Sequence, residues 1–351
     1  MSYKKSLLSI GLALLGASCL GGASDAIILS EFVEAAPKEP EVHSSTITEV
    51  SPGVFLAAWF GGAKEADKDT QIWGARRTAE GWGESFVIEK GLDDKGEPTP
   101  VYNPSLYTHK DGRVTLFYFA GIWEGGVKKY CMKDSTDGGL TWSPERLVPK
   151  NLHGPCRAKP LLLSDGSLLY PTSGKGTGYT NWSDEAMTPE SWGSSPGAKD
   201  PGKLAAFQPT LLQKNDGTVL MFFRSNAREI GVARSTDLGR TWSPIKGIGI
   251  YKANSAIDVL KLRDGRCLLI YNKTPKPAAS SKSWGPRHPL TLALSTDEGE
   301  TWRDLFNIET DKIREGFAYP TMIQAGDGSV HITYTWGRKR IKHVVIDPAK
   351  L

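Results

Sequence analysis

Three stretches of this 351-residue chain repeat nearly the same octapeptide: STDGGLTW at 135–142, STDLGRTW at 235–242 and STDEGETW at 295–302. In this pattern the Asp carboxylate can accept hydrogen bonds from backbone N–H groups of its own turn, and the Gly can adopt a left-handed conformation. The Trp supplies a large apolar side chain for packing between neighbouring units. Three equivalent copies cannot all face one site, so we interpret the octapeptide as a structural turn rather than a catalytic motif.

A larger repeat surrounds the octapeptides, and it consists of a short apolar strand, a tight turn and a second apolar strand. The turn contains Asp-Gly in five copies and Pro-Gly in the other, and these dipeptides supply the positive φ that hairpin turns need. The flanks alternate or run apolar, as half-buried strands do. The six hairpins begin at His43, Asn103, Lys159, Gln208, Ala256 and Tyr319.

Six units of about four strands each predict an all-β fold, a six-bladed β-propeller with these turns between its strands. A blade cannot bury both of its faces alone, so neighbouring blades must stack. We interpret SDEAMTPESW, which ends at Trp192, and TAEGWG, which contains Trp82, as degenerate octapeptides of the third and first units. The last unit lacks one strand: RIKHVVID gives its third, and AIILSEFV at 26–33 its fourth, so that the two ends of the propeller close the ring.

Residues 1–26 have the pattern of an export signal, and residues 27–351 form the predicted propeller domain. Lys4 and Lys5 provide the charged start, and the apolar stretch LLSIGLALLGASCL is too short to span a bilayer. Cys19 follows Gly-Ala-Ser, so a lipid anchor at Cys19 is an alternative to a cleaved signal. No later apolar run is long enough to cross a membrane. We expect an exported protein that is periplasmic, extracellular or lipid-anchored at the cell surface.

Charge and cysteine content exclude other classes of protein. The net charge is +4, and the scattered Lys and Arg residues argue against a nucleic-acid partner. The one basic run, at 338–342, we interpret as a solvated strand end. Cys131, Cys156 and Cys267 form no metal-type cluster, so we expect buried free thiols, with one disulfide as the alternative, and neither metal nor cofactor. We expect a monomer.

The octapeptides resemble the Asp-boxes, or BNR repeats, of the sialidase (neuraminidase) superfamily, and the six-hairpin pattern extends this resemblance over nearly the whole mature chain. The stretches AAWFGG, DVLKLRDG and YTWGRKRIKHVVIDP are similar to the bacterial "predicted neuraminidase" branch. The resemblance implies an Asp-box propeller that acts on glycans. Sialidases place an arginine triad on the sugar carboxylate, a Tyr nucleophile beside a Glu, and an Asp as acid/base.

Several of these family residues have counterparts here. Arg224, in a strand that ends in Arg-Ser, matches the second triad arginine, and Arg287, before a strand that leads into an Asp-box, matches the third. Tyr319 opens the sixth hairpin and matches the nucleophile. In the loop after the first hairpin, Asp69 is the first candidate for the acid/base, with Asp67 and Glu65 behind it.

Two positions depart from the family pattern. His43 stands where the first arginine is expected, and Gln208 replaces the Glu beside the tyrosine. A tyrosine phenol has a pKa of about 10 and needs a base or a strongly positive field to act as a nucleophile. Gln208 cannot take its proton. Residues at or near the starts of other inner strands are further candidates for substrate contacts, and these are Asn103, Lys159 and Asp258.

The resemblance therefore implies an exported, exo-acting glycoside hydrolase that removes sialic acid or a related acidic sugar. In a retaining mechanism Asp69 protonates the leaving oxygen while Tyr319 attacks the anomeric carbon. One alternative is an enzyme for uronic-acid polysaccharides, either a hydrolase or a lyase. In a lyase, Arg224 or Gln208 would neutralise the carboxylate, His43 would act as base and Tyr319 as acid. The other alternative is a glycan-binding propeller without catalysis.

Overall fold

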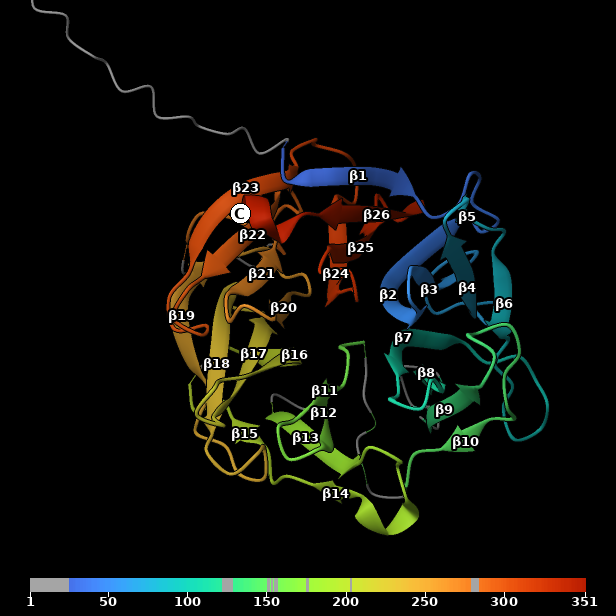
Figure 1. The fold of residues 1–351 in the computed structure, drawn as a ribbon, viewed down its shortest axis with the longest axis horizontal. Helices are drawn as coiled ribbons and strands as arrows, with labels where there is room; N and C mark the ends of the chain where they lie inside the picture. The colour runs from blue at the N-terminus through green and yellow to red at the C-terminus, as the bar shows by residue number, and fades with distance from the viewer. Residues whose placement is uncertain are drawn as a thin grey trace, which may run out of the picture.

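Six antiparallel sheets surround one central axis (Figure 1), which confirms the six-bladed β-propeller predicted from the hairpins. The computed structural model describes residues 25–121, 129–149, 152, 154, 157–174, 177–202, 204–278 and 284–351. Cys19, Cys156 and all but the last two residues of the predicted export signal therefore lie outside the described residues. Within the described ranges the helical elements are two short turns, η1 (Pro189–Ser191) and η2 (Pro348–Lys350). No helix in this part of the chain could span a membrane.

The first three blades follow one another in the sequence, and each begins with the strand closest to the axis. Blade 1 comprises β2 (Glu41–Ser51), β3 (Val54–Gly62) and β4 (Gln71–Thr78), with β5 (Gly81–Trp82) and β6 (Phe86–Glu89) both paired to β4. Blade 2 comprises β7 (Val101–Thr108), β8 (Val114–Ala120), β9 (Lys129–Ser135) and β10 (Arg146–Leu147). Blade 3 comprises β11 (Leu161–Leu162), β12 (Ser167–Gly174) and β13 (Thr177–Asp184), with β14 (Gly193–Ser194) and β15 (Ala198–Lys199) paired to β13.

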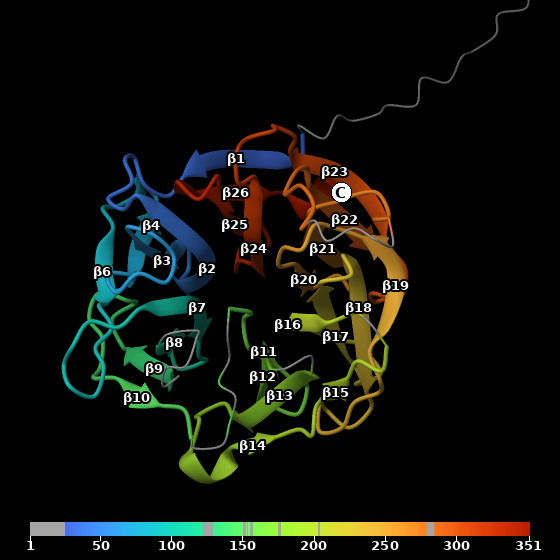
Figure 2. The same cartoon turned by 180° about the vertical axis from the view of Figure 1, so that it is seen from behind.

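The last three blades repeat this order, so that β2, β7, β11, β16, β20 and β24 line the centre in Figure 1 and, from behind, in Figure 2. Blade 4 comprises β16 (Ala206–Gln213), β17 (Val219–Ser225), β18 (Glu229–Ser235) and β19 (Lys246–Tyr251). Blade 5 comprises β20 (Asp258–Lys261), β21 (Cys267–Tyr271), β22 (Leu290–Ser295) and β23 (Arg303–Glu309). Blade 6 comprises β24 (Phe317–Gln324), β25 (Val330–Trp336), β26 (Arg340–Ile346) and β1 (Ile27–Phe32).

The ring closes through β1, which pairs antiparallel with β26 and forms the outer edge of blade 6 (Figure 1). The pairing runs from Ile27 opposite Ile346 to Phe32 opposite Lys342, so the closure predicted from the sequence is confirmed. Glu31 of β1 then joins two blades, because its carboxylate lies 3.1 Å from His343 Nδ1 in blade 6 and 2.7 Å from Arg77 Nε in blade 1. Closing the sheet in this way gives blade 6 four strands, the same number as blades 2, 4 and 5.

The hydrophobic core lies between the blades rather than within any one of them. Leu56 of blade 1, for example, belongs to one buried cluster with Leu116 of blade 2, and Leu220 of blade 4 to another with Leu269 of blade 5. Each blade thus buries one face against each neighbour, as the propeller prediction requires. Cys131 and Cys267 are buried free thiols, which confirms that part of the cysteine prediction.

The Asp-boxes form identical turns between the third and fourth strands of blades 2, 4 and 5, far from the inner strands. In the blade 4 copy, Asp237 Oδ1 accepts the Thr241 N–H at 2.8 Å, and Ser235 Oγ accepts the Gly239 N–H at 2.8 Å. The other two copies repeat both bonds. The degenerate copy in blade 3 keeps part of the pattern, since Asp184 accepts the Thr188 N–H at 2.8 Å. The structural interpretation of the octapeptide is confirmed.

The glycine of each Asp-box packs against the second strand of the preceding blade, so the turn joins neighbouring blades. A Cβ built on Gly239, whose φ is +82°, would lie 2.6 Å from Leu169 of blade 3, and one built on Gly139 would lie 2.5 Å from Leu56 of blade 1. The Trp242 indole N–H adds a hydrogen bond across the same interface, to Thr180 Oγ1 at 3.0 Å. The repeat therefore fixes how closely adjacent blades approach.

Gly239→Ala should destabilise the propeller more than Gly217→Ala. Both glycines have φ near +85°, but a Cβ on Gly217 meets nothing within 4 Å. The control substitution should cost about 1 kcal/mol for the left-handed backbone, and Gly239→Ala about 1–3 kcal/mol more for the contact with Leu169. Urea unfolding of both variants measures the difference. Equal losses of stability would contradict the proposed packing role.

Candidate active site

Most inner strands carry a non-glycine residue in the left-handed region near the end at which the strand begins. Ser44, Asn103, Gln208 and Tyr319 have φ values of 55°, 51°, 47° and 53°. At each of these positions the pairing with the next strand skips a register, which is the mark of a β-bulge. Bulges re-aim side chains and are common next to active sites. In blade 3 the equivalent backbone belongs to Arg157, with φ of 73°, just before β11.

Tyr319, Gln208 and Arg224 converge on one hydrogen-bonded group. Arg224 Nη1 donates to the Tyr319 phenol oxygen at 2.8 Å and to Gln208 Oε1 at 2.7 Å. The Arg224 side chain is held from behind by Asn254, whose Oδ1 and backbone carbonyl each accept a guanidinium N–H at 2.9 Å. Three residues predicted from the sequence therefore meet, and their partner Asn254 was not predicted.

The phenol of Tyr319 lies in a positive field. Withdrawal from water raises its pKa, but Arg224 and Arg287, together with the hydrogen bond to Gln208, outweigh that effect and hold the pKa below the usual value. Among the described residues, no carboxylate forms a hydrogen bond with the phenol oxygen. Within the described residues, the pKa of the Tyr319 phenol is therefore lowered by cations and the hydrogen bond to Gln208 rather than by an adjacent base.

His43 lies against the Tyr319 ring, with 4.2 Å between the ring centroids. The side chain is buried, and its Nδ1 forms a 2.9 Å hydrogen bond with Thr335 Oγ1, while Nε2 has no hydrogen-bond partner among the described residues. Burial, and then the charges of Arg338, Arg287 and other arginines, hold the pKa of His43 well below its usual value. The imidazole is therefore neutral at neutral pH and cannot replace the charge of the missing arginine.

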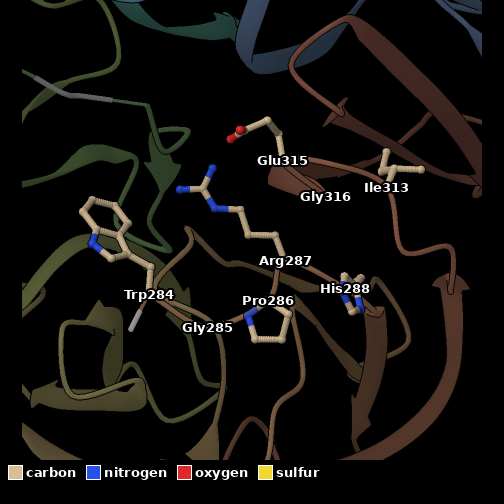
Figure 3. Close-up of a pocket in the computed structure, with 8 residues that line it drawn as sticks. All are labelled: Trp284, Gly285, Pro286, Arg287, His288, Ile313, Glu315 and Gly316. Atoms are coloured by element: carbon tan, nitrogen blue, oxygen red, sulfur yellow. The ribbon is translucent and has the colours of Figure 1, made fainter. Parts of the chain in front are cut away.

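Arg287 lines a cavity of about 350 Å³ between the loop before β22 and the loop before β24. Figure 3 shows its guanidinium and the Glu315 carboxylate extending into the same space, with the exposed Trp284 opposite. The Gly316 backbone packs tightly beneath it, since a Cβ there would lie 2.6 Å from the Arg287 carbonyl oxygen. Within the described residues the guanidinium forms no hydrogen bond or ion pair, so it is available to a ligand.

Asp69 lies on the exposed loop between β3 and β4, and its Oδ2 accepts the Ala63 N–H at 3.0 Å. Another acidic residue of the loop, Glu65, has the stronger connection to the site, because its charge acts on Tyr319 and its carboxylate lies 2.7 Å from Arg338 Nη2. Arg338 was assigned to a solvated strand end from the sequence, yet its side chain is only 18% exposed. The pairing between these two loops is not visible in the sequence.

Lys159 and Asp258 form an ion pair of 2.5 Å rather than facing the cavity with unpaired groups. Asp258 is 1% exposed, and its oxygens also accept hydrogen bonds from Thr210 Oγ1 and the Met322 N–H. Asn103 is buried, with its carbonyl oxygen bound by the Arg157 N–H at 3.1 Å. The polar groups of these three residues are thus bonded to other protein groups. Their role in substrate binding stays a prediction.

Arg157 is a buried arginine at the axis that the sequence analysis missed. Its guanidinium donates to the carbonyl oxygens of Ile257 in blade 5 and Pro320 in blade 6, and its Cζ lies 5.3 Å from the Tyr319 ring centroid. Lys159 heads the third predicted hairpin, and the left-handed residue Arg157 lies two residues before it. Lys159 precedes a proline, as Gln208 and Tyr319 do. In this blade, however, the left-handed residue Arg157 comes before that dipeptide rather than within it.

Comparisons with known proteins identify the family and the fold. The family model described as a BNR repeat-like domain matches residues 53–332. A protein named sialidase from Paraclostridium sordellii is 34% identical over 130 residues, 30% of each chain. Another sialidase, from Bacteroides fragilis (strain YCH46), is 23% identical over 300 residues, 72% of this chain and 52% of its own. The chain thus spans about half or less of these relatives.

Among solved structures, the K499G mutant of the NanB sialidase from Streptococcus pneumoniae superposes with a TM-score of 0.70 at 16% identity. The match covers 90% of this chain and 69% of that one. At this identity the likeness concerns the fold alone.

An alkaline titration followed by tyrosinate absorbance should show a tyrosine that ionises below the usual pKa of about 10, and Tyr319→Phe should remove that step. Arg224→Gln should move the step to higher pH, because the phenolate loses its nearest cation. Tyr271→Phe is the matched control, since burial raises the pKa of Tyr271. Superimposable curves for the wild type and Tyr319→Phe below pH 10 would contradict the positive field inferred here.

Proposed function

Because the chain belongs to the family of BNR repeat-like domains, within the sialidase superfamily, we propose that it is an exported, sialidase-like glycoside hydrolase. Its substrate would be a glycan that ends in a carboxylate-bearing sugar, either sialic acid or a related acidic sugar. The observation that carries the proposal is the contact of 2.8 Å between Arg224 and the Tyr319 phenol, with Arg287 beside them. A nucleophile close to carboxylate-binding cations is what such a reaction needs.

Each residue has a distinct chemical task in this proposal. Arg224 and Arg287 would hold the sugar carboxylate, for which the planar guanidinium is suited because it can donate two parallel hydrogen bonds. Tyr319, whose lowered pKa favours the phenolate, would attack the anomeric carbon. Asp69 or Glu65, from the loop between β3 and β4, would protonate the leaving oxygen and later activate water. Gln208 would orient the phenol rather than accept its proton.

A second candidate function is elimination from a uronic-acid polysaccharide. The observation that favours it is the contact between the neutral His43 ring and Tyr319, with His43 Nε2 lacking a partner. A neutral imidazole can take the proton from C5 of a uronate, while a tyrosine can protonate the leaving oxygen. The very low pKa of His43 makes it a weak base, however, so hydrolysis is the first proposal.

The test is to incubate the purified protein with sialyl-lactose, sialylated glycans and uronate-containing oligosaccharides, and to identify the products by mass spectrometry. We expect release of the free acidic sugar, and a loss of roughly 100-fold or more in turnover for Tyr319→Phe. Tyr251→Phe, on the outer strand β19, is the control and should keep full activity. A product lighter by one water would identify elimination instead. Binding without turnover would identify a lectin-like propeller, and either outcome would end the hydrolase proposal.

Gln208→Glu should raise the rate of hydrolysis by about 10-fold or more, because a carboxylate beside the phenol can act as a base. Gln213→Glu, at the other end of β16, adds the same charge far from Tyr319 and should leave the rate unchanged. Initial rates over a range of pH measure the effect, and the rate of the Gln208→Glu variant should fall as the new carboxylate is protonated. A rate below that of the wild type across the range would show that the site depends on a neutral residue here.

A further inference from the structure

The turn between β25 and β26 holds an arginine in a backbone conformation that favours glycine. Gly337 and Arg338 have φ values of 59° and 57°, and the turn closes through a bond from the Lys339 N–H to the Trp336 carbonyl at 3.0 Å. Glycine is the default residue at such positions, and a non-glycine residue there carries a strain that is most common at functional sites.

The backbone of this turn is bound to both sides of the candidate active site. The turn bonds directly to the strand that carries His43 and to the loop before β24, and that loop bonds in turn to the loop before β22. Three backbone hydrogen bonds connect these segments: Val42 N–H to Arg338 O at 3.0 Å, Gly337 N–H to Gly316 O at 2.8 Å, and Phe317 N–H to Arg287 O at 2.8 Å. Arg338 is therefore positioned by the same backbone network that positions Arg287.

The Arg338 side chain faces acidic partners that a ligand could replace. Its guanidinium lies 2.7 Å from Glu65 and 3.7 Å from Glu41, and the side chains of Arg338 and Glu65 are 18% and 34% exposed. Arg338 lines a cavity of about 360 Å³ that shares Ile313 and Glu315 with the cavity of Arg287. Its charge also acts on both His43 and Arg287. The ion pair with Glu65 thus lies at the rim of the candidate site and within reach of solvent.

We propose that Arg338 is a third substrate-binding arginine, which exchanges Glu65 for the carboxylate of the bound acidic sugar. The inference rests on the proposed function and adds a specificity residue that comes from the β25–β26 turn rather than from the strand that carries His43. The exchange conserves charge, because one carboxylate replaces another on the same guanidinium. It also frees Glu65, whose charge acts on Tyr319, from its ion pair only when an acidic substrate is bound.

The test measures binding of sialic acid and of glucuronic acid, each with its methyl ester as the uncharged analogue, by isothermal titration calorimetry. We expect the wild type to bind one acid more tightly than its ester. Arg338→Gln should weaken the binding of that acid by roughly 10- to 100-fold, the range for a lost hydrogen bond to a charged group. It should leave the affinity for the ester unchanged. Arg303→Gln, on the exposed strand β23, removes the same charge far from the axis and should change neither affinity.

Two further variants separate binding from a structural role. Glu65→Gln should strengthen binding of the acid, because it removes the carboxylate that competes for Arg338, whereas a purely structural ion pair would not give this gain. Arg338→Gly should lose affinity for the acid while its melting temperature stays at or above that of the wild type, because glycine relieves the left-handed backbone. A lower melting temperature with unchanged affinity would assign Arg338 to the fold and overturn the proposal.

The outcomes distinguish this inference from the proposed function. If the wild type prefers an acid to its ester but Arg338→Gln keeps that preference, the inference falls while the proposed function stands. If the wild type prefers neither acid to its ester, both fall together.

Discussion

The carboxylate of Asp258 joins four of the six blades at the centre of the ring. Asp258 belongs to blade 5, and it accepts hydrogen bonds from Lys159 of blade 3, Thr210 of blade 4 and the Met322 N–H of blade 6. A buried charge that lost one of these partners would be costly, by about 3–5 kcal/mol for a broken buried pair. The blades contact one another mainly through apolar faces, so this polar junction adds directional contacts between the inner parts of blades 3 to 6.

The junction also explains why strained residues can be held around it. Arg157 bonds to the carbonyl oxygens of Ile257 and Pro320, which adjoin Asp258 and Tyr319 in the chain. The chain next to Tyr319 is thereby held at Pro320, and the chain near Gln208 is held by the bond from Thr210 Oγ1 to Asp258. Left-handed conformations such as those of Gln208 and Tyr319 cost about 1–3 kcal/mol each and persist only where the surroundings over-determine them. The geometry of the candidate site therefore depends on the hydrogen bonds of Asp258 and Arg157 at the centre of the ring.

Local patterns explain which features could be predicted from the sequence. Asp-Gly turns, apolar strands and the Asp-box bonds between Asp237 and Thr241 depend on residues close together in the chain, so the blades and their order could be predicted. Arg157 and Arg338 could not, because their positions depend on bulges and on contacts between different blades. A shift of two residues in the third hairpin was enough to replace Arg157 by Lys159. Likewise, the sequence shows a basic run at Arg338 but not the opposing carboxylate of Glu65.

The replacement at position 208 changes how the phenol of Tyr319 can be activated. A glutamate in place of Gln208 would lie 2.7 Å from Arg224, and its negative charge would cancel much of the field that this arginine exerts on Tyr319. Gln208 keeps the hydrogen bond to Arg224 without that charge, so the two arginines, together with the hydrogen bond to Gln208, lower the pKa of the phenol. A site of this kind exchanges a proton acceptor for a stronger positive field. Because the same field attracts a carboxylate, the proposed activation of Tyr319 and the proposed selection of an acidic sugar would depend on the same arginines.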